Sequence, residues 1–216
     1  MKHKGVIFDL DGTLLDSMPI WDNIGSKYLR TLGLAPAEDL HEKIKIMSLL
    51  QCAGLLREQY CLPYTEEKIM QQINALIEEQ YRSLVPLKPH VITFLQRLNK
   101  AGAELCIATA TDRYLVEAAL ERLGIAGYFK FILTCGEAGC GKDVPVIYHR
   151  ALELLNTRLD DTVIFEDALY AIKSAKAAGF TVVGVHDASA ASDEEAIKSI
   201  ADSYIYTFEE WKVEER

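Results

Sequence analysis

The sequence lacks the features that mark membrane and secreted proteins. No apolar run reaches the roughly 18 residues that a membrane-spanning helix requires. The first apolar run follows a basic start, residues 1–4, and ends before Asp9, which is too short for a secretory signal. Half of the residues are hydrophobic, so a packed core is expected and wholesale disorder is not. We therefore expect a globular cytoplasmic protein that does not bind membranes.

Cysteine and positive charge are also in short supply. The chain has five cysteines, an odd number, and no two of them form a C-x-x-C motif. We therefore expect reduced thiols rather than a disulfide framework or a zinc site. The 23 basic residues are outnumbered by 32 acidic ones, which gives a formal net charge of −9. This balance argues against nucleic acid as a partner. It does not exclude a small anionic substrate, because charges within a site can oppose the overall field.

What is present is an alternation of short apolar runs with helical patterns. The chain of 216 residues has room for one domain, or for one domain with a smaller insert. Runs such as Val163-Ile164-Phe165 are unbroken, which is typical of parallel strands buried on both faces. The sequence therefore predicts an α/β fold with a doubly wound parallel sheet. We expect its strands at residues 5–8, 104–108, 131–134, 162–165, 181–185 and 203–206.

One interval between predicted strands is too long for a simple crossover. About 95 residues separate the first two strands, where a crossover needs only a dozen or so residues and its helix. The excess has helical periodicity throughout, and Pro86 and Pro89 mark the return of the chain. We therefore expect a helical domain at residues 17–85, inserted between the two parts of an α/β domain at residues 1–16 and 86–216.

Two carboxylates follow the first predicted strand directly, in Asp9-Leu10-Asp11-Gly12-Thr13. If the strand geometry persists, Asp9 and Asp11 point the same way at the carboxyl end of the sheet, where α/β proteins bind ligands. Neighbouring carboxylates can act as nucleophile and acid/base, or as ligands for a hard cation. The alternative is an acidic surface turn, because Asp-Gly is common in turns.

This stretch resembles the first motif of the haloacid dehalogenase-like hydrolases. The layout, with a helical insert in the place of the family's cap domain, is most similar to the branch of β-phosphoglucomutase and small-metabolite phosphatases. The resemblance implies that the Thr109 hydroxyl and the N–H of Ala110 bind the phosphoryl group, together with Lys142 in Gly-Lys-Asp-Val-Pro. From the residues alone, Thr111 and Asp112 suit the start of a helix, and a lone lysine is usually a solvated surface charge.

A further acidic pair follows the fourth predicted strand. Glu166-Asp167 resembles the family's last motif, although Ala168 and Ala171 replace its serine and glycine. The resemblance implies a Mg²⁺ site made by the carboxylates of Asp9 and Asp167 and the carbonyl oxygen of Asp11. Glu166 would be a further ligand or would hold one in place. The alternative is a pair of acids that stabilises a helix N-terminus.

A competing motif overlaps Lys142. The spacing Gly136-x-x-x-x-Gly141-Lys142 matches most of a phosphate-binding P-loop, which would favour a nucleotidyl kinase. The next residue is Asp143, where that motif needs Ser or Thr, and an aspartate there would repel the phosphates. We therefore favour the hydrolase interpretation.

The resemblance implies a Mg²⁺-dependent phosphatase of a small phosphorylated metabolite, possible substrates including sugar phosphates. Asp9 would form an aspartyl phosphate and Asp11 would act as acid and base, which argues against dehalogenase chemistry. A phosphoglucomutase-like activity is the main alternative, but the mutase's cap histidine aligns with Trp21, and residues 46–50 contain no arginine for a second phosphate. A non-catalytic module that binds a phosphate ligand is another alternative. The sequence leaves the oligomeric state open.

Overall fold

The computed structural model describes residues 4–44 and 49–213. Its contacts divide the chain into two compact units, one of Met1–Ser17 with Val85–Arg216 and one of Met18–Leu84. Both ends of the smaller unit lie one residue inside the helical segment expected from the sequence. Each unit buries its own apolar side chains.

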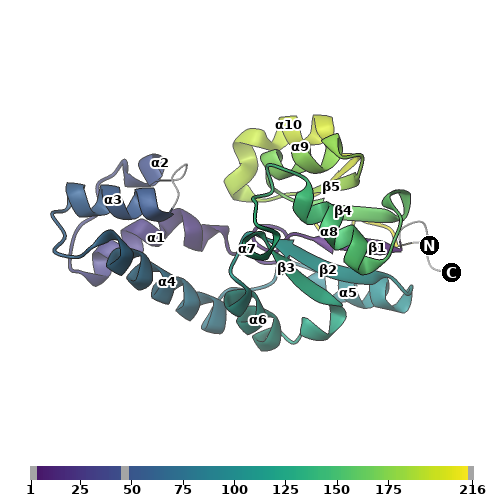
Figure 1. Ribbon diagram of the computed structural model, residues 1–216, viewed down its shortest axis with the longest axis horizontal. Coiled ribbons are helices and arrows are strands. Elements are labelled where there is room, and N and C mark those ends of the chain that lie inside the picture. The colour runs from purple at the N-terminus through teal and green to yellow at the C-terminus, as the bar shows by residue number, and fades with distance from the viewer. Residues whose placement is uncertain (1–3, 45–48, 214–216) are drawn as a thin grey trace. The chain divides into compact units, whose positions relative to one another are not determined.

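The larger unit is built on a six-stranded sheet in the order β3-β2-β1-β4-β5-β6 (Figure 1). All neighbouring strands pair in parallel. The predicted α/β fold is therefore confirmed, and each strand end lies within one residue of its predicted position. The strands are β1 (Gly5–Phe8), β2 (Glu104–Thr109), β3 (Phe131–Thr134), β4 (Thr162–Glu166), β5 (Thr181–Val185) and β6 (Ser203–Ile205).

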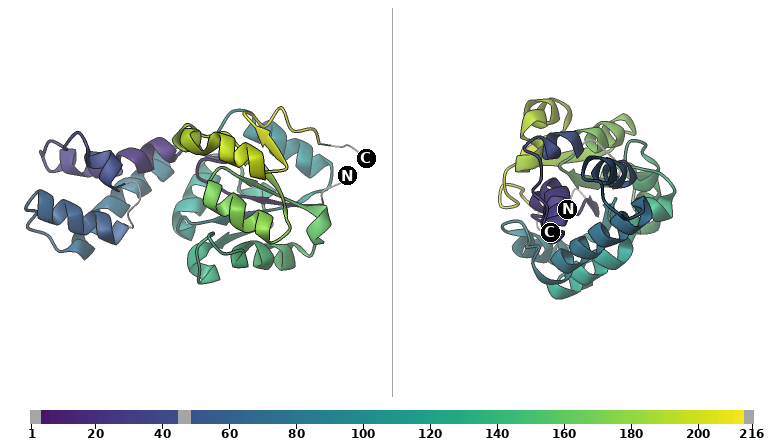
Figure 2. Two further views of the ribbon diagram at one scale, coloured as in Figure 1. Left: turned by 90° about the horizontal axis from the view of Figure 1, so that it is seen from above. Right: turned by 90° about the vertical axis from the view of Figure 1, so that its left-hand side faces the viewer.

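Helices cover both faces of this sheet, and β1 runs through its middle (Figure 2). The register places Ile7 beside Cys106 and Ile164, and this face forms one core cluster with the side chains of the helices α8 and α9. The helices of the unit are α5 (Val91–Lys100), α6 (Arg113–Arg122), α7 (Cys135–Ala138), α8 (Val146–Leu155), α9 (Leu169–Ala177) and α10 (Glu194–Ile200), with short 3₁₀ turns η1 (Ala126–Tyr128), η2 (Leu159–Asp161) and η3 (Ala188–Asp193).

The opposite face of the sheet carries an aromatic cluster. Because side chains alternate along a strand, Phe8 points away from Ile7 and stacks on Phe165, with ring centroids 5.1 Å apart. Phe94 of α5 stacks on Phe208 at 4.9 Å, and the edge of Trp211 meets Phe165 at 5.5 Å. The segment after β6 is therefore packed onto the same core.

Two apolar patterns in the sequence are shifted in the structure. In α8, the sequence offers the apolar pattern Ile147, Ala151, Leu154 and Leu155, but Leu154 is 54% exposed. Tyr148 is buried instead, because the buried stripe is centred between Ile147 and Tyr148 and Leu154 lies off its edge. In the smaller unit, Leu84 is exposed because the helix that it follows ends at Ser83.

The described part of the smaller unit is helical, with α1 (Met18–Thr31), α2 (Leu40–Ile44), α3 (Leu49–Gln59) and α4 (Glu66–Ser83). The hydroxyl of Thr65 accepts a hydrogen bond from the N–H of Lys68 and caps α4. The indole N–H of Trp21 donates to the hydroxyl of Tyr81 over 3.0 Å. Among the described residues, no helix is both long and apolar enough to cross a membrane.

Candidate active site

The strand β1 delivers Asp9 to the carboxyl end of the sheet. The strand ends at Phe8, and the N–H of Asp9 still donates to the carbonyl of Phe165 over 2.9 Å. A tight turn follows at once, in which the N–H groups of Leu14 and Leu15 both donate to the carbonyl of Leu10. Asp11 lies in this turn, beyond the end of β1, so its position depends on the turn and not on the strand ladder.

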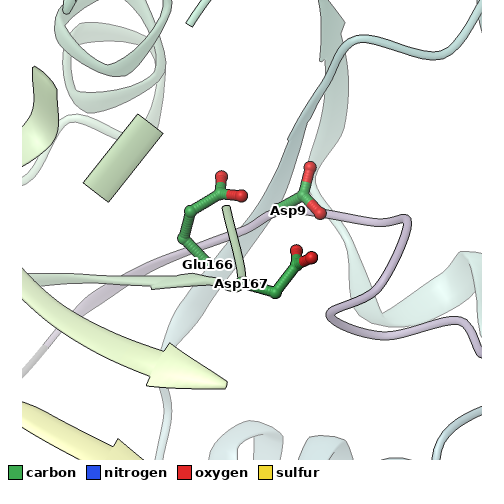
Figure 3. A group of neighbouring side chains, drawn as sticks. All are labelled: Asp9, Glu166 and Asp167. Atoms are coloured by element: carbon green, nitrogen blue, oxygen red, sulfur yellow. The ribbon is translucent and has the colours of Figure 1, made fainter. Parts of the chain in front are cut away.

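The neighbouring strand β4 brings two further acids to the same place. Asp9, Glu166 and Asp167 each offer a carboxylate oxygen, and these oxygens all lie within 4.8 Å of one another. Figure 3 shows the three carboxylates facing a common space at the ends of β1 and β4. All three residues are buried. The carboxylate of Asp11 does not belong to this group.

A buried lysine partly neutralises the acidic group. The Nζ of Lys142 donates to Asp9 Oδ1 and, over 2.8 Å, to Glu166 Oε2. The hydroxyl of Tyr148 also donates to Glu166 Oε2, over 3.1 Å. Burial lowers the pKa of Lys142, but the two carboxylates outweigh this effect and hold its pKa well above the ordinary value. Lys142 is therefore a permanent cation inside the site.

Lys142 balances only part of the negative charge of the three carboxylates. Burial and the nearby Glu166 raise the pKa of Asp9 to about 6, and the charge of Lys142 offsets only part of this rise. Burial, Asp9 and Glu166 also raise the pKa of Asp167, whose Oδ1 accepts a hydrogen bond of 2.9 Å from the hydroxyl of Thr13. Three carboxylates face one ammonium, and oxygen ligands of this kind suit a hard divalent cation such as Mg²⁺.

Gly12 allows the turn to approach this group. Its φ angle is +84°, and a Cβ at this position would lie 2.3 Å from Asp167 Oδ2. A side chain would therefore collide with the carboxylate, in a backbone conformation that only glycine adopts readily.

Asp11 is held by two hydroxyl groups. Ser17 Oγ donates to Asp11 Oδ1 over 2.6 Å, and Thr111 Oγ1 donates to Asp11 Oδ2 over 2.5 Å. The suggestion that Thr111 caps the helix that follows β2 is wrong, because the N-cap of α6 is Asp112. The Thr111 hydroxyl is used by Asp11 instead.

The expected phosphoryl-binding residues stand at the end of β2. Thr109 is buried, and its Oγ1 accepts the N–H of Thr111 over 3.0 Å, so its O–H remains able to donate. Ala110 follows at the exposed end of the strand. Parallel pairing places the ends of β1 and β2 side by side.

The hydroxyls of Thr13, Ser17 and Tyr148 contact the site without having been predicted from the sequence. Thr13 belongs to the recognised motif and Tyr148 to a helix whose buried stripe is otherwise apolar. A buried tyrosine needs a partner for its hydroxyl, so a polar contact of Tyr148 could have been anticipated from its place in this helix. The contact of Ser17 could not, because it depends on the turn geometry.

Known proteins resemble this chain along most of its length. The family model described as haloacid dehalogenase-like hydrolase matches residues 6–185. Hexitol phosphatase A of Escherichia coli (strain K12) is 33% identical over 190 residues, which cover 86% of this chain and 84% of that protein. A phosphorylated carbohydrates phosphatase of Thermotoga maritima is 27% identical over 176 residues, or 82% of each chain.

A solved structure also resembles this chain. A Thermotoga maritima protein provisionally named β-phosphoglucomutase has a TM-score of 0.81 and 26% identity, with 94% of each chain covered. From the extent of the family match and of these similarities, the chain belongs to the haloacid dehalogenase-like hydrolases, in their β-phosphoglucomutase and phosphatase branch.

Proposed function

We propose that the protein is a Mg²⁺-dependent phosphatase that hydrolyses a small phosphomonoester through an aspartyl phosphate. The observation that carries the proposal is the buried group of Asp9, Glu166 and Asp167 with Lys142 at the carboxyl ends of β1 and β4. Relatives named as phosphatases support the reaction class.

Asp9 is the proposed nucleophile. Its carboxylate lies at the end of the central strand, and its contact with Lys142 favours the ionised form that attack requires. Attack of a carboxylate oxygen on phosphorus forms the phosphoaspartate and releases the alcohol of the substrate. Lys142 stays beside the reacting atoms, where its charge stabilises the equatorial oxygens of the phosphoryl group.

Asp11 is the proposed acid and base. It protonates the leaving oxygen, and the resulting carboxylate then takes a proton from the water that attacks the phosphoaspartate. The Ser17 and Thr111 hydroxyls fix the orientation of its carboxyl group. Thr109 and the N–H of Ala110 would donate to the phosphoryl oxygens.

The residues that would hold Mg²⁺ are Asp9, Asp167 and the carbonyl oxygen of Asp11, with Glu166 close enough to contribute. Glu166 already accepts hydrogen bonds from Lys142 and Tyr148, so its first contribution is to hold the lysine. When bound, the cation reduces the repulsion between the anionic substrate and the anionic nucleophile.

A phosphorylated sugar or sugar alcohol is the substrate class that we infer from the named relatives. The unit Met18–Leu84 is inserted at the place in the chain where this branch has its cap domain. We propose that it recognises the part of the substrate beyond the phosphate. Trp21, fixed by Tyr81, is the proposed contact for an apolar or ring portion. A mutase is disfavoured because residues 46–50 contain no arginine, although residues 45–48 lie outside the described part.

The test is phosphate release from a panel of phosphomonoesters, with Mg²⁺ and with a chelator. The panel contains an aryl phosphate, pentose, hexose and hexitol phosphates, and nucleotides. We expect release only with Mg²⁺, and we expect Asp9→Asn to abolish it without loss of folding. Asp16→Asn is the matched control, because Asp16 is an exposed carboxylate that follows the same turn.

Two results would contradict the proposal. Turnover by Asp9→Asn at the wild-type rate would refute the nucleophile. No release from any substrate, together with conversion of β-glucose 1-phosphate in the presence of a bisphosphate, would favour the mutase. If neither reaction occurs, the protein is a non-catalytic binding module.

A further inference from the structure

Two cysteines flank the short helix α7, just before Lys142. Cys135 is the first residue of α7, and Cys140 lies two residues beyond its end. Both are free thiols and both are partly exposed. From Cys140 the chain passes through Gly141 to Lys142, whose Nζ holds Asp9 and Glu166.

The helix end brings the two cysteines together. Gly139 ends α7 in the left-handed conformation, with a φ angle of +76°. The N–H groups of Gly139 and Cys140 both donate to the carbonyl of Cys135, over 2.9 and 3.3 Å. A hydrogen bond of 3.3 Å, extended by the covalent bonds on each side, leaves the Cα atoms of Cys135 and Cys140 at most about 7 Å apart.

This upper limit overlaps the range of Cα separations in which disulfides form. Disulfides join Cα atoms about 4.4–6.8 Å apart. In helix ends closed in this way, the residue after the glycine often contacts the side chain five positions before it, and here these two residues are the cysteines. The Sγ of Cys140 now donates weakly to the carbonyl of Ala138, over 3.9 Å, which is a contact that is easily given up.

The surroundings of Cys135 slow its reaction with oxidants. Burial raises the pKa of the Cys135 thiol, and the ammonium of Lys142 offsets only part of this rise. A thiol that stays protonated reacts slowly with oxidants. We therefore expect Cys135 to be oxidised only when the oxidant concentration is high.

We propose that Cys135 and Cys140 form a reversible disulfide when the protein meets a hydroperoxide. One thiol loses its proton, its thiolate attacks the peroxide and the O–O bond breaks; the products are a sulfenic acid and a hydroxide or alkoxide, which takes up the lost proton to become water or an alcohol. The second thiol attacks the sulfenic sulfur, an S–S bond forms, and water leaves with the remaining proton. The two sulfurs are oxidised by two electrons in total and the peroxide is reduced by two.

The disulfide ties the end of α7 to its start, two residues before Lys142. It thereby restricts the segment that presents the lysine to Asp9. The consequence for turnover rests on the proposed function, whereas the disulfide itself does not. Oxidation is therefore expected to lower phosphate release several-fold, and a thiol reductant is expected to restore it.

Peptide mapping tests the disulfide directly. Trypsin cuts after Lys130 and Lys142, so Cys135 and Cys140 lie together in the peptide of residues 131–142, which contains no other cysteine. The intact protein is treated with hydrogen peroxide, quenched in acid and digested. We expect this peptide to become lighter by two hydrogen atoms, and dithiothreitol to restore its mass.

The exposed Cys61 serves as the internal control, because it is the only cysteine in the peptide of residues 58–68. Cys140→Ser should abolish the mass loss and protect turnover, whereas Cys61→Ser should change neither. The proposal is overturned if peptide 131–142 keeps its mass while Cys61 is oxidised, or if it gains oxygen without losing hydrogen. A disulfide without any effect on turnover would uphold the modification and refute its effect on the Lys142 segment.

Discussion

Replacing Gly12 by alanine tests how the acidic group is held in place. The new Cβ would lie 2.3 Å from Asp167 Oδ2 and 2.7 Å from Asp167 Cγ. Such contacts cannot persist, so the carboxylate of Asp167 must move. The φ angle of +84° adds backbone strain that is independent of the contact.

The two costs can be separated. A left-handed conformation costs a residue with a Cβ about 1–2 kcal/mol. Moving Asp167 breaks its hydrogen bond with Thr13, and a buried bond to a charged group is worth about 1.5–3 kcal/mol. Gly12→Ala should therefore lower the free energy of unfolding by about 2.5–5 kcal/mol. Gly102→Ala should cost only the backbone strain, because Gly102 has a φ angle of +79° and open space around its Cβ position.

Thermal unfolding and phosphate release distinguish the variants. For a chain of this size, each kcal/mol moves the unfolding temperature by about 2–4 °C. We expect both variants to unfold at a lower temperature, but only Gly12→Ala to lose Mg²⁺-dependent turnover, by about 10–100-fold because a residue of the cation site is displaced. If the two variants have equal turnover and equal stability, Asp167 does not depend on Gly12 and the reasoning fails.

Two further predictions concern the larger unit. Lys88→Met removes the cation that contacts the buried Asp187 over 2.8 Å, and we expect a loss of about 3–5 kcal/mol in urea unfolding. Burial works against the ionised form of Asp187, but hydrogen bonds with Lys88 and Ser189 outweigh it and lower the pKa of Asp187. The contribution of the pair is therefore complete above the unfolded pKa of about 3.9 and is lost as the pH falls through the folded pKa. A gap between wild type and Lys88→Met that stays constant in acid would contradict this. His90 has a left-handed φ angle of +66°, which glycine adopts without strain, so His90→Gly should stabilise the protein by about 0.5–1 kcal/mol. The contact with Glu209 that the variant loses is exposed and contributes little. A lower unfolding temperature would argue against this.

The sheet could be predicted because its strands are short, apolar and separated by clear helix ends. Runs such as Val6-Ile7-Phe8 are typical of a strand buried on both faces. The side-chain pattern of α8 was harder to predict, because Tyr148 and Leu154 are both large, and the stripe that is buried depends on what the helix packs against. That information lies in strands far away in the sequence.

The motifs of the candidate site were easier to recognise in the sequence than the contacts between their residues. The motifs around Asp9, Lys142 and Glu166 were recognised by resemblance, and the family is confirmed. The pairing of Asp11 with Thr111 joins residues 100 positions apart, and it depends on how a turn after β1 faces the end of β2. The sequence alone suggested a helix cap for Thr111, because local hydrogen bonding is all that a local pattern can reveal.

The tryptophans have a practical consequence. The chain has two, and each compact unit contains one, Trp21 in the smaller unit and Trp211 in the larger. Trp21 lies against Tyr81 and Trp211 against Phe165, so each indole senses the loss of packing in its own unit. Two variants, each with one tryptophan replaced by phenylalanine, would therefore let fluorescence follow the melting of the two units independently. Coincident transitions would mean that the units unfold as one cooperative body, and separate transitions would assign each its own stability.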